Sequence, residues 1–172
     1  PRERILVAPN GFDALAFEVQ RNKKELREEL GLPVSARVVL YTGHLYDWKG
    51  AGVLLEAART AKSKIQNAKF VFVGGTEKDV ANFKEKARGV DNVLILGYKP
   101  YKEIPKYLKA ADVLVLPNSG FSKEARFAVY SQHDTSPIKL FEYMASGVPI
   151  VASALPSICE ILHPVNAIFV KP

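Results

Sequence analysis

The stretch at residues 134–153, DTSPIKLFEYMASGVPIVAS, decides most of what can be inferred about the fold. Pro137 suits the first position of a helix, where a missing N–H costs nothing, and Ser136 or Thr135 can cap the free N–H groups. Such a helix start attracts anions when it lies beside a strand end, because unpaired N–H groups and the helix dipole point there. The stretch therefore predicts an anion-binding helix.

The same stretch predicts which side of the helix is buried. Apolar residues recur at helical spacing and are expected to face a core: Ile138, Phe141, Met144 and Ala145. Lys139 and Glu142 then lie on the polar side. Gly147 is expected to end the helix, and the apolar run at 149–152 is typical of a buried strand.

Outward from this stretch, short apolar runs alternate with helical patterns. Strands are predicted at 5–8, 37–42, 70–73, 93–96, 113–116 and 167–170, and helices at 23–30, 51–65, 78–87 and 104–110. Apolar strands separated by helices indicate an α/β fold: a doubly wound, mostly parallel, Rossmann-like sheet with helices on both faces. The irregular segment 118–135 is either a mobile loop over the ligand site or a plain surface insertion.

Composition indicates a single globular domain of 172 residues, with 48% hydrophobic and 24% charged residues. The net charge of +6 favours anionic partners, but no nucleic-acid-binding motif is present. One cysteine and three widely spaced histidines argue against a disulfide or a zinc site. Because no signal peptide or membrane-length apolar run occurs, we expect a cytoplasmic location, with peripheral membrane association of the full enzyme left open.

The two carboxylates resemble the signature of a known family, the retaining nucleotide-sugar glycosyltransferases of family 4 (glycosyl transferases group 1). The usual pattern there is Glu, seven residues, Glu, then a turn to Gly-x-Pro-Ile/Val-Val. Asp134 stands at the first Glu and Glu142 at the second. The resemblance covers nearly the whole chain and implies that residues 1–172 are the donor-binding, carboxyl-terminal half of a two-domain GT-B enzyme, without its amino-terminal acceptor domain.

The loop at 42–50, TGHLYDWKG, resembles the family's Gly-Arg-Leu loop that ends in Lys-Gly. Gly43 and Gly50 permit tight turns, and Lys49 matches the lysine that holds the donor diphosphate. His44 occupies the arginine position, where it would be a weaker and pH-sensitive hydrogen-bond donor. Alternatively, Lys49 is solvent-exposed and His44 only bonds a loop carbonyl.

The resemblance also assigns the other site residues. Asp134, Lys49 and Glu142 would be catalytic, with Glu142 on the ribose hydroxyls and Asp134 on the transferred sugar. The donor-binding set is Gly43, His44, Lys49, Gly74, Gly97, Tyr98, Asp134, Ser136, Pro137, Ile138, Lys139 and Glu142. Two alternatives stay open: Lys139 and Glu142 form an ordinary helix-surface pair, or Tyr98 is a packed surface aromatic.

These assignments imply an enzyme half that binds a UDP-, GDP- or ADP-sugar and serves a glycan, lipid or small-molecule acceptor. The resemblance implies retention of configuration and no metal or other cofactor. We expect the isolated chain to bind donor but not to transfer sugar. The alternatives are a non-catalytic nucleotide-binding module and a sugar-nucleotide epimerase of the same architecture. P-loop, nucleophile-elbow and dinucleotide-binding signatures do not occur.

Overall fold

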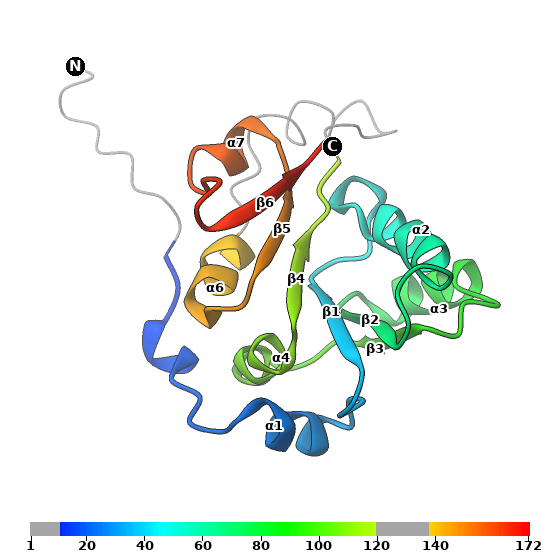
Figure 1. The fold of residues 1–172 in the computed structure, drawn as a ribbon, viewed down its shortest axis with the longest axis horizontal. Coiled ribbons are helices and arrows are strands. Elements are labelled where there is room, and N and C mark those ends of the chain that lie inside the picture. Colours follow the sequence, from blue (N-terminus) through cyan, green and yellow to red (C-terminus); the bar gives the residue numbers. More distant parts are fainter. Residues whose placement is uncertain (1–10, 120–137) are drawn as a thin grey trace.

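The computed structural model describes residues 11–119 and 138–172, and its strands form one six-stranded sheet (Figure 1). The order is β3-β2-β1-β4-β5-β6, and every pairing is parallel. The strands are β1 Arg37–Thr42, β2 Ala68–Val73, β3 Val93–Gly97, β4 Val113–Leu116, β5 Ile150–Ser153 and β6 Ala167–Val170. The predicted doubly wound α/β class is confirmed, whereas the strand expected at 5–8 lies outside the described residues.

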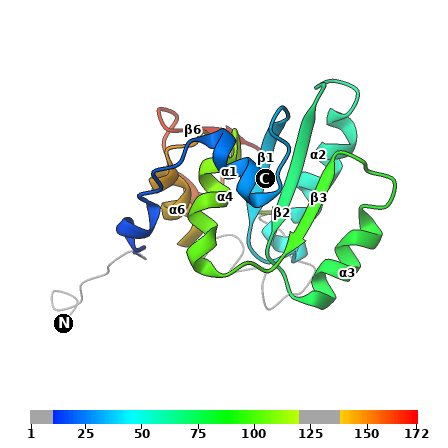
Figure 2. The same cartoon turned by 90° about the horizontal axis from the view of Figure 1, so that it is seen from below.

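Helices cover both faces of this sheet. They are α1 Lys23–Leu30, α2 Ala51–Ala61, α3 Glu77–Lys86, α4 Ile104–Ala110, α6 Ile138–Ser146 and α7 Pro156–Cys159. Short 3-10 turns are η2 Ala14–Phe17, η3 Asp47–Lys49 and η4 Tyr101–Glu103. Helices α2 and α3 lie on one side of the sheet, and α1, α4 and α6 lie on the other (Figures 1 and 2).

Side chains that point alternately to the two faces of each strand explain the two hydrophobic cores. In β1, Val38 and Leu40 belong to the core under α1, α4 and α6, while Tyr41 belongs to the core under α2 and α3. The same alternation places Val71 and Phe72 of β2 in opposite cores. Because successive strand residues point to opposite faces, a strand buried on both sides is apolar throughout.

The order of the strands places a crevice at one edge of the sheet. From β1 the chain moves outward through β2 to β3 and then returns to β4 on the other side of β1. The two halves diverge between β1 and β4. In open α/β sheets, ligands bind outside the carboxyl ends of the strands at such a point.

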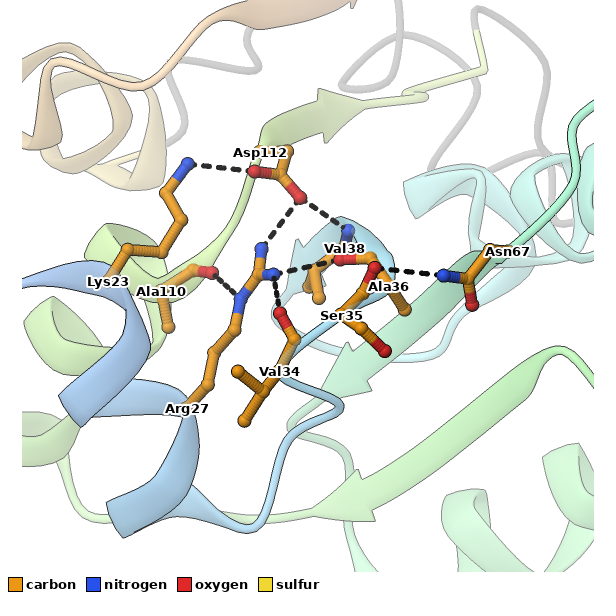
Figure 3. Close-up of polar contacts among 9 residues, drawn as sticks. All are labelled: Lys23, Arg27, Val34, Ser35, Ala36, Val38, Asn67, Ala110 and Asp112. Atoms are coloured by element: carbon orange, nitrogen blue, oxygen red, sulfur yellow. Dashed lines mark hydrogen bonds and ion pairs between the residues drawn. The ribbon is translucent and has the colours of Figure 1, made fainter.

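The opposite, amino-terminal edge is closed by a buried arginine (Figure 3). Arg27 of α1 is 4% exposed. It donates to the carbonyls of Ala110 (2.8 Å), Ala36 (2.8 Å) and Val34 (3.1 Å), and it pairs with Asp112 at 2.6 Å. Since the Asp112 carboxylate also accepts from the Val38 N–H at 2.7 Å, the pair joins α1 to the starts of β1 and β4.

Two helix predictions need correction. The helix expected to reach residue 65 ends at Ala61, because Ile65 is exposed and has no core to pack against. In α6, Ile138 and Met144 are 50% and 41% exposed instead of buried. The fully buried residues of that helix are Leu140 and Tyr143, which the apolar spacing did not single out.

Candidate functional site

Glycines let three strand ends approach closely at the carboxyl edge of the sheet. The N–H of Gly43, after β1, donates to the Val73 carbonyl at 2.8 Å, and the N–H of Gly74 donates to the Gly97 carbonyl at 2.7 Å. Gly74 has a φ of 120°, and a Cβ there would lie 2.4 Å from the Gly43 carbonyl oxygen. Only glycine fits such a contact at positive φ. The predicted turns at these positions are therefore steric requirements of the site.

A cavity of about 260 Å³ opens beside these strand ends. It is lined by the ends of β1 and β2 with the loops that follow them, the segment after β3, the start of α4, and helix α6. Its residues are Thr42, Gly43, His44, Val73, Gly74, Gly75, Tyr98, Lys99, Ile104, Lys139 and Glu142. Six of the residues predicted from sequence thus share one cavity although they come from distant parts of the chain.

Lys139 extends from α6 to the end of β1. Its Nζ donates to the Thr42 carbonyl at 3.2 Å and lies 4.3 Å from the ring centroid of Tyr41. Burial lowers the pKa of Lys139 to about 7, repulsion by Lys49 acts in the same direction, and Glu142 opposes both. An ammonium over an aromatic face is stabilised by the ring quadrupole, which keeps this amine at the cavity wall.

Glu142 lies one turn further along α6 and is only 6% exposed. Burial raises its pKa, while hydrogen bonding from the Tyr101 hydroxyl and the charge of Lys139 lower it. Among the ion pairs between described residues, none joins Lys139 to Glu142. The alternative of an ordinary helix-surface pair is therefore wrong. A buried carboxylate at a cavity wall is a hydrogen-bond acceptor suited to a polar ligand.

Lys49 ends η3 and lies near this cavity without lining it. Its Nζ is 3.9 Å from the ring centroid of Trp48, and burial lowers its pKa. The side chain is half-buried, so the alternative of a solvent-exposed lysine is wrong. Lys49 and Lys139 are close enough to repel each other, so two basic side chains meet at this edge of the sheet.

His44 is exposed and stacks on Tyr46, with ring centroids 4.8 Å apart and planes 3° from parallel. Its carbonyl accepts from the Tyr41 hydroxyl at 2.5 Å. The imidazole also contributes to lowering the pKa of Asp79, after the larger effects of hydrogen bonding to Thr76. His44 thus lines the cavity from a loop that is held by aromatic contacts.

The remaining predicted residues fall into two groups. Gly97 ends β3 without lining the cavity, and Ile138 is half exposed at the start of α6. Asp134, Ser136 and Pro137 lie outside the described residues. Tyr98 lines the cavity but is 76% exposed, so it is not packed on the surface.

Besides the lining residues Thr42, Val73, Gly75 and Ile104, the predicted set lacks three residues that act on this site. The Tyr41 ring lies next to the Lys139 amine, the Tyr101 hydroxyl acts to lower the pKa of Glu142, and Lys99 lines the cavity. The only available signal was position: Tyr41 precedes the end of a strand, and Lys99 and Tyr101 follow Tyr98 directly. In the described part of the chain, His, Cys, Asp and Glu side chains form no group of three or more that could hold a metal ion.

The family model for glycosyl transferases group 1 matches residues 22–172. The chain belongs to this family. The match corresponds to the carboxyl-terminal domain of a GT-B glycosyltransferase of group 1. Within the described residues, no helix is long and apolar enough to cross a membrane.

One curated relative is the UDP-Gal:alpha-D-GlcNAc-diphosphoundecaprenol alpha-1,3-galactosyltransferase of Escherichia coli. It is 31% identical over 156 residues, which are 87% of this chain and 36% of that enzyme. More generally, the chain spans about two fifths of the length of the curated relatives it matches, 42% and 37% for two of them.

Two solved structures share the fold. HepE of Anabaena, in complex with UDP-glucose, has a TM-score of 0.70 and 22% identity, and the match covers 95% of this chain and 42% of that one. The C-terminal domain of the group 1 protein LpcC from Francisella tularensis has a TM-score of 0.66 and 23% identity, covering 94% and 80% respectively. The second match shows that this fold occurs as a separately crystallised domain.

Proposed function

We propose that this chain is the donor-binding domain of an enzyme that transfers a sugar from a nucleoside-diphosphate sugar to an acceptor hydroxyl with retention of configuration. The observation that carries the proposal is one cavity in which a cationic Lys139 and a buried Glu142 face the glycine-rich ends of β1 and β2. A diphosphate needs positive charge, and ribose hydroxyls need an acceptor. Both are present one helical turn apart.

The proposed donor orientation follows from this placement. The diphosphate lies against Lys139 and Lys49, the ribose hydroxyls donate to Glu142, and the base lies towards Tyr98. Asp134 is proposed to contact the transferred sugar, on the family motif alone. UDP is the first nucleotide to test, because the E. coli relative is named for UDP-Gal and HepE was crystallised with UDP-glucose.

The proposed chemistry uses protein charges at the leaving group. The bond between the sugar C1 and the diphosphate oxygen breaks, a bond from C1 to the acceptor oxygen forms, and the acceptor proton passes to the released diphosphate. Lysine ammonium groups stabilise the charge that develops on that diphosphate. The acceptor is proposed to bind in another domain of the full protein and to approach the transferred sugar from there.

Calorimetric titration with UDP tests the nucleotide site. Glu142→Ala is expected to weaken binding by about 1–3 kcal/mol, the cost of removing a buried hydrogen-bonding partner. Glu85→Ala, which removes an exposed carboxylate of α3, is the matched control and should bind as wild type does. Equal affinity of wild type and Glu142→Ala would remove Glu142 from the site.

A second experiment tests whether the domain acts alone. The isolated chain is incubated with its best-binding nucleotide sugar and candidate acceptors, and glycosylated product is measured. We expect binding without transfer, because transfer needs donor and acceptor aligned with water excluded. Turnover comparable to that of the full-length enzyme would show that acceptor binding also resides in this chain. Epimerised sugar nucleotide would favour the epimerase alternative.

A further inference from the structure

Lys139 is a lysine of the cavity wall that forms no ion pair with a carboxylate of the described residues. No ion pair between described residues includes it, and its contacts are the Thr42 carbonyl and the ring of Tyr41. By comparison, Lys23, Lys62 and Lys106 on the surface each lie 2.7–2.8 Å from a carboxylate oxygen. The lysine in the cavity is thus less well neutralised than lysines in water.

The groups that face Lys139 explain why its charge is disfavoured. Lys49 approaches from the β1–α2 loop and repels it, whereas Glu142 on its own helix attracts it. Tyr41 below it and Tyr143 beside it on α6 are buried phenols whose pKa values are raised by burial, so both stay neutral. His44 and Lys99 line the same cavity. Burial and a like charge therefore outweigh the attraction of the Glu142 carboxylate.

We propose that Lys139 is partly unprotonated in the free cavity and takes up a proton when a diphosphate binds. The inference rests on the proposed function, since it requires an anionic ligand in this cavity. A diphosphate brings negative charge into contact with the amine, and an opposite charge nearby favours the protonated form. The proton comes from solvent, and the amine becomes an ammonium that bonds a phosphate oxygen. Donor binding is thereby coupled to pH.

The sign of the coupling follows from this uptake. In the free cavity the pKa of Lys139 is about 7, so the amine loses its proton as pH rises from 7 to 8. Because the diphosphate binds the protonated form, affinity falls over that interval, by about fivefold for a group that titrates at 7. An arginine at this position would stay protonated and abolish the dependence.

Calorimetry with UDP at pH 8 tests the proposal, because the terminal phosphate of UDP is already ionised there. The binding enthalpy is measured in three buffers of different ionisation enthalpy. The slope of a plot of binding enthalpy against buffer ionisation enthalpy gives the number of protons taken up. Wild type is expected to take up between a half and one proton per UDP, and Lys139→Arg close to none. Between pH 7 and 8, wild-type affinity should fall by about fivefold relative to Lys139→Arg.

Two further outcomes decide against the proposal in different ways. If wild type and Lys139→Arg both bind UDP and take up the same number of protons, the proton goes elsewhere and only this inference is overturned. If wild type binds none of UDP, GDP and ADP, the proposed function falls with it. Lys139→Met, which keeps the length of the side chain, should bind UDP weakly and without proton uptake, while circular dichroism confirms that it is folded.

Discussion

The basic side chains at the two edges of the sheet differ in how many polar partners they have. At the amino-terminal edge, Arg27 is nearly inaccessible and uses its guanidinium for three carbonyls and the Asp112 carboxylate (Figure 3). At the carboxyl-terminal edge, Lys139 has one carbonyl and an aromatic face, and another lysine repels it. Arg27 is buried and paired with a carboxylate, whereas Lys139 is half-buried and has no carboxylate partner among the described residues.

This difference separates a structural charge from a binding charge. A fully hydrogen-bonded buried pair holds elements together, and removing one partner leaves the other uncompensated. A cation without a counter-ion destabilises the free protein, and the binding of an anion offsets this destabilisation. We therefore expect the charged residues of the amino edge to stabilise the fold and Lys139 at the carboxyl edge to serve ligand binding. Mutations at the two edges test this.

The largest effect is expected at the amino edge. Arg27→Met keeps much of the side-chain volume but removes the guanidinium partner of Asp112 and the donor to the buried carbonyls of Ala110 and Ala36. The free energy of unfolding should fall by about 3–5 kcal/mol, as is usual when one partner of a buried pair is removed. Urea denaturation followed by circular dichroism measures it.

The matched variant at the carboxyl edge is Lys139→Met. Because Lys139 has no ion-pair partner among described residues, we expect its removal to change the free energy of unfolding by less than about 1 kcal/mol, towards greater stability. A loss similar to that of Arg27→Met would mean that Lys139 is structural, and the contrast between the two edges would not hold.

A glycine at the carboxyl edge should give the next largest effect. Gly50 has a φ of 78°, and a Cβ there would lie 1.6 Å from the Pro117 carbonyl oxygen. Gly50→Ala is therefore expected to cost about 2–4 kcal/mol, from backbone strain and a steric clash together. Gly31→Ala shares the positive φ but meets no atom within 4 Å, and should cost about 1–2 kcal/mol. Equal thermal stabilities of the two variants would show that the loop moves freely.

Stability at the amino edge is expected to depend on pH through Asp112. Burial raises the pKa of Asp112, but Lys23, the Val38 N–H and Arg27 lower it further, to about 2. Since the folded pKa lies below the ordinary value of 3.8, this contribution is present above pH 4 and is lost as pH falls towards 2. After allowance for partial exposure, it is about 1–2 kcal/mol.

Asp112→Asn is the variant that checks this titration. Its stability should change less than that of wild type between pH 4 and pH 2, when both are measured by urea denaturation at each pH. Parallel losses in the two proteins would assign the acid sensitivity to other carboxylates.

The smallest effect is expected for an exposed pair. Glu85 lies on α3 and Arg88 follows the helix. The Arg88 guanidinium nitrogen is 2.7 Å from a Glu85 carboxylate oxygen, but both side chains are largely in solvent. Glu85→Gln should change the free energy of unfolding by less than about 0.5 kcal/mol, since water screens such pairs. A loss of more than about 1 kcal/mol would show that burial does not decide which ion pairs matter here.

Much of the fold could be predicted from local patterns. The bounds of α1, β1, α4, β4 and β6 are those expected from apolar runs and from start and stop residues. Helix α7 was missed because its four residues, Pro156–Cys159, are too few to show helical periodicity. The buried face of α6 was predicted wrongly because apolar residues of this helix occur on all its sides. Spacing alone therefore did not reveal that Tyr143 and Leu140 are the buried ones.

Short-range patterns and one motif were enough to predict the parallel class of the sheet, the family and the carboxylate Glu142. Only the tertiary structure decided that Lys139 reaches the end of β1, that Tyr41 lies beneath it, and that Glu142 is buried. The physical reason is that burial and charge balance depend on residues far apart in the chain. Thr42 and Lys139 are 97 residues apart, yet the hydrogen bond between them holds the lysine amine at the wall of the cavity.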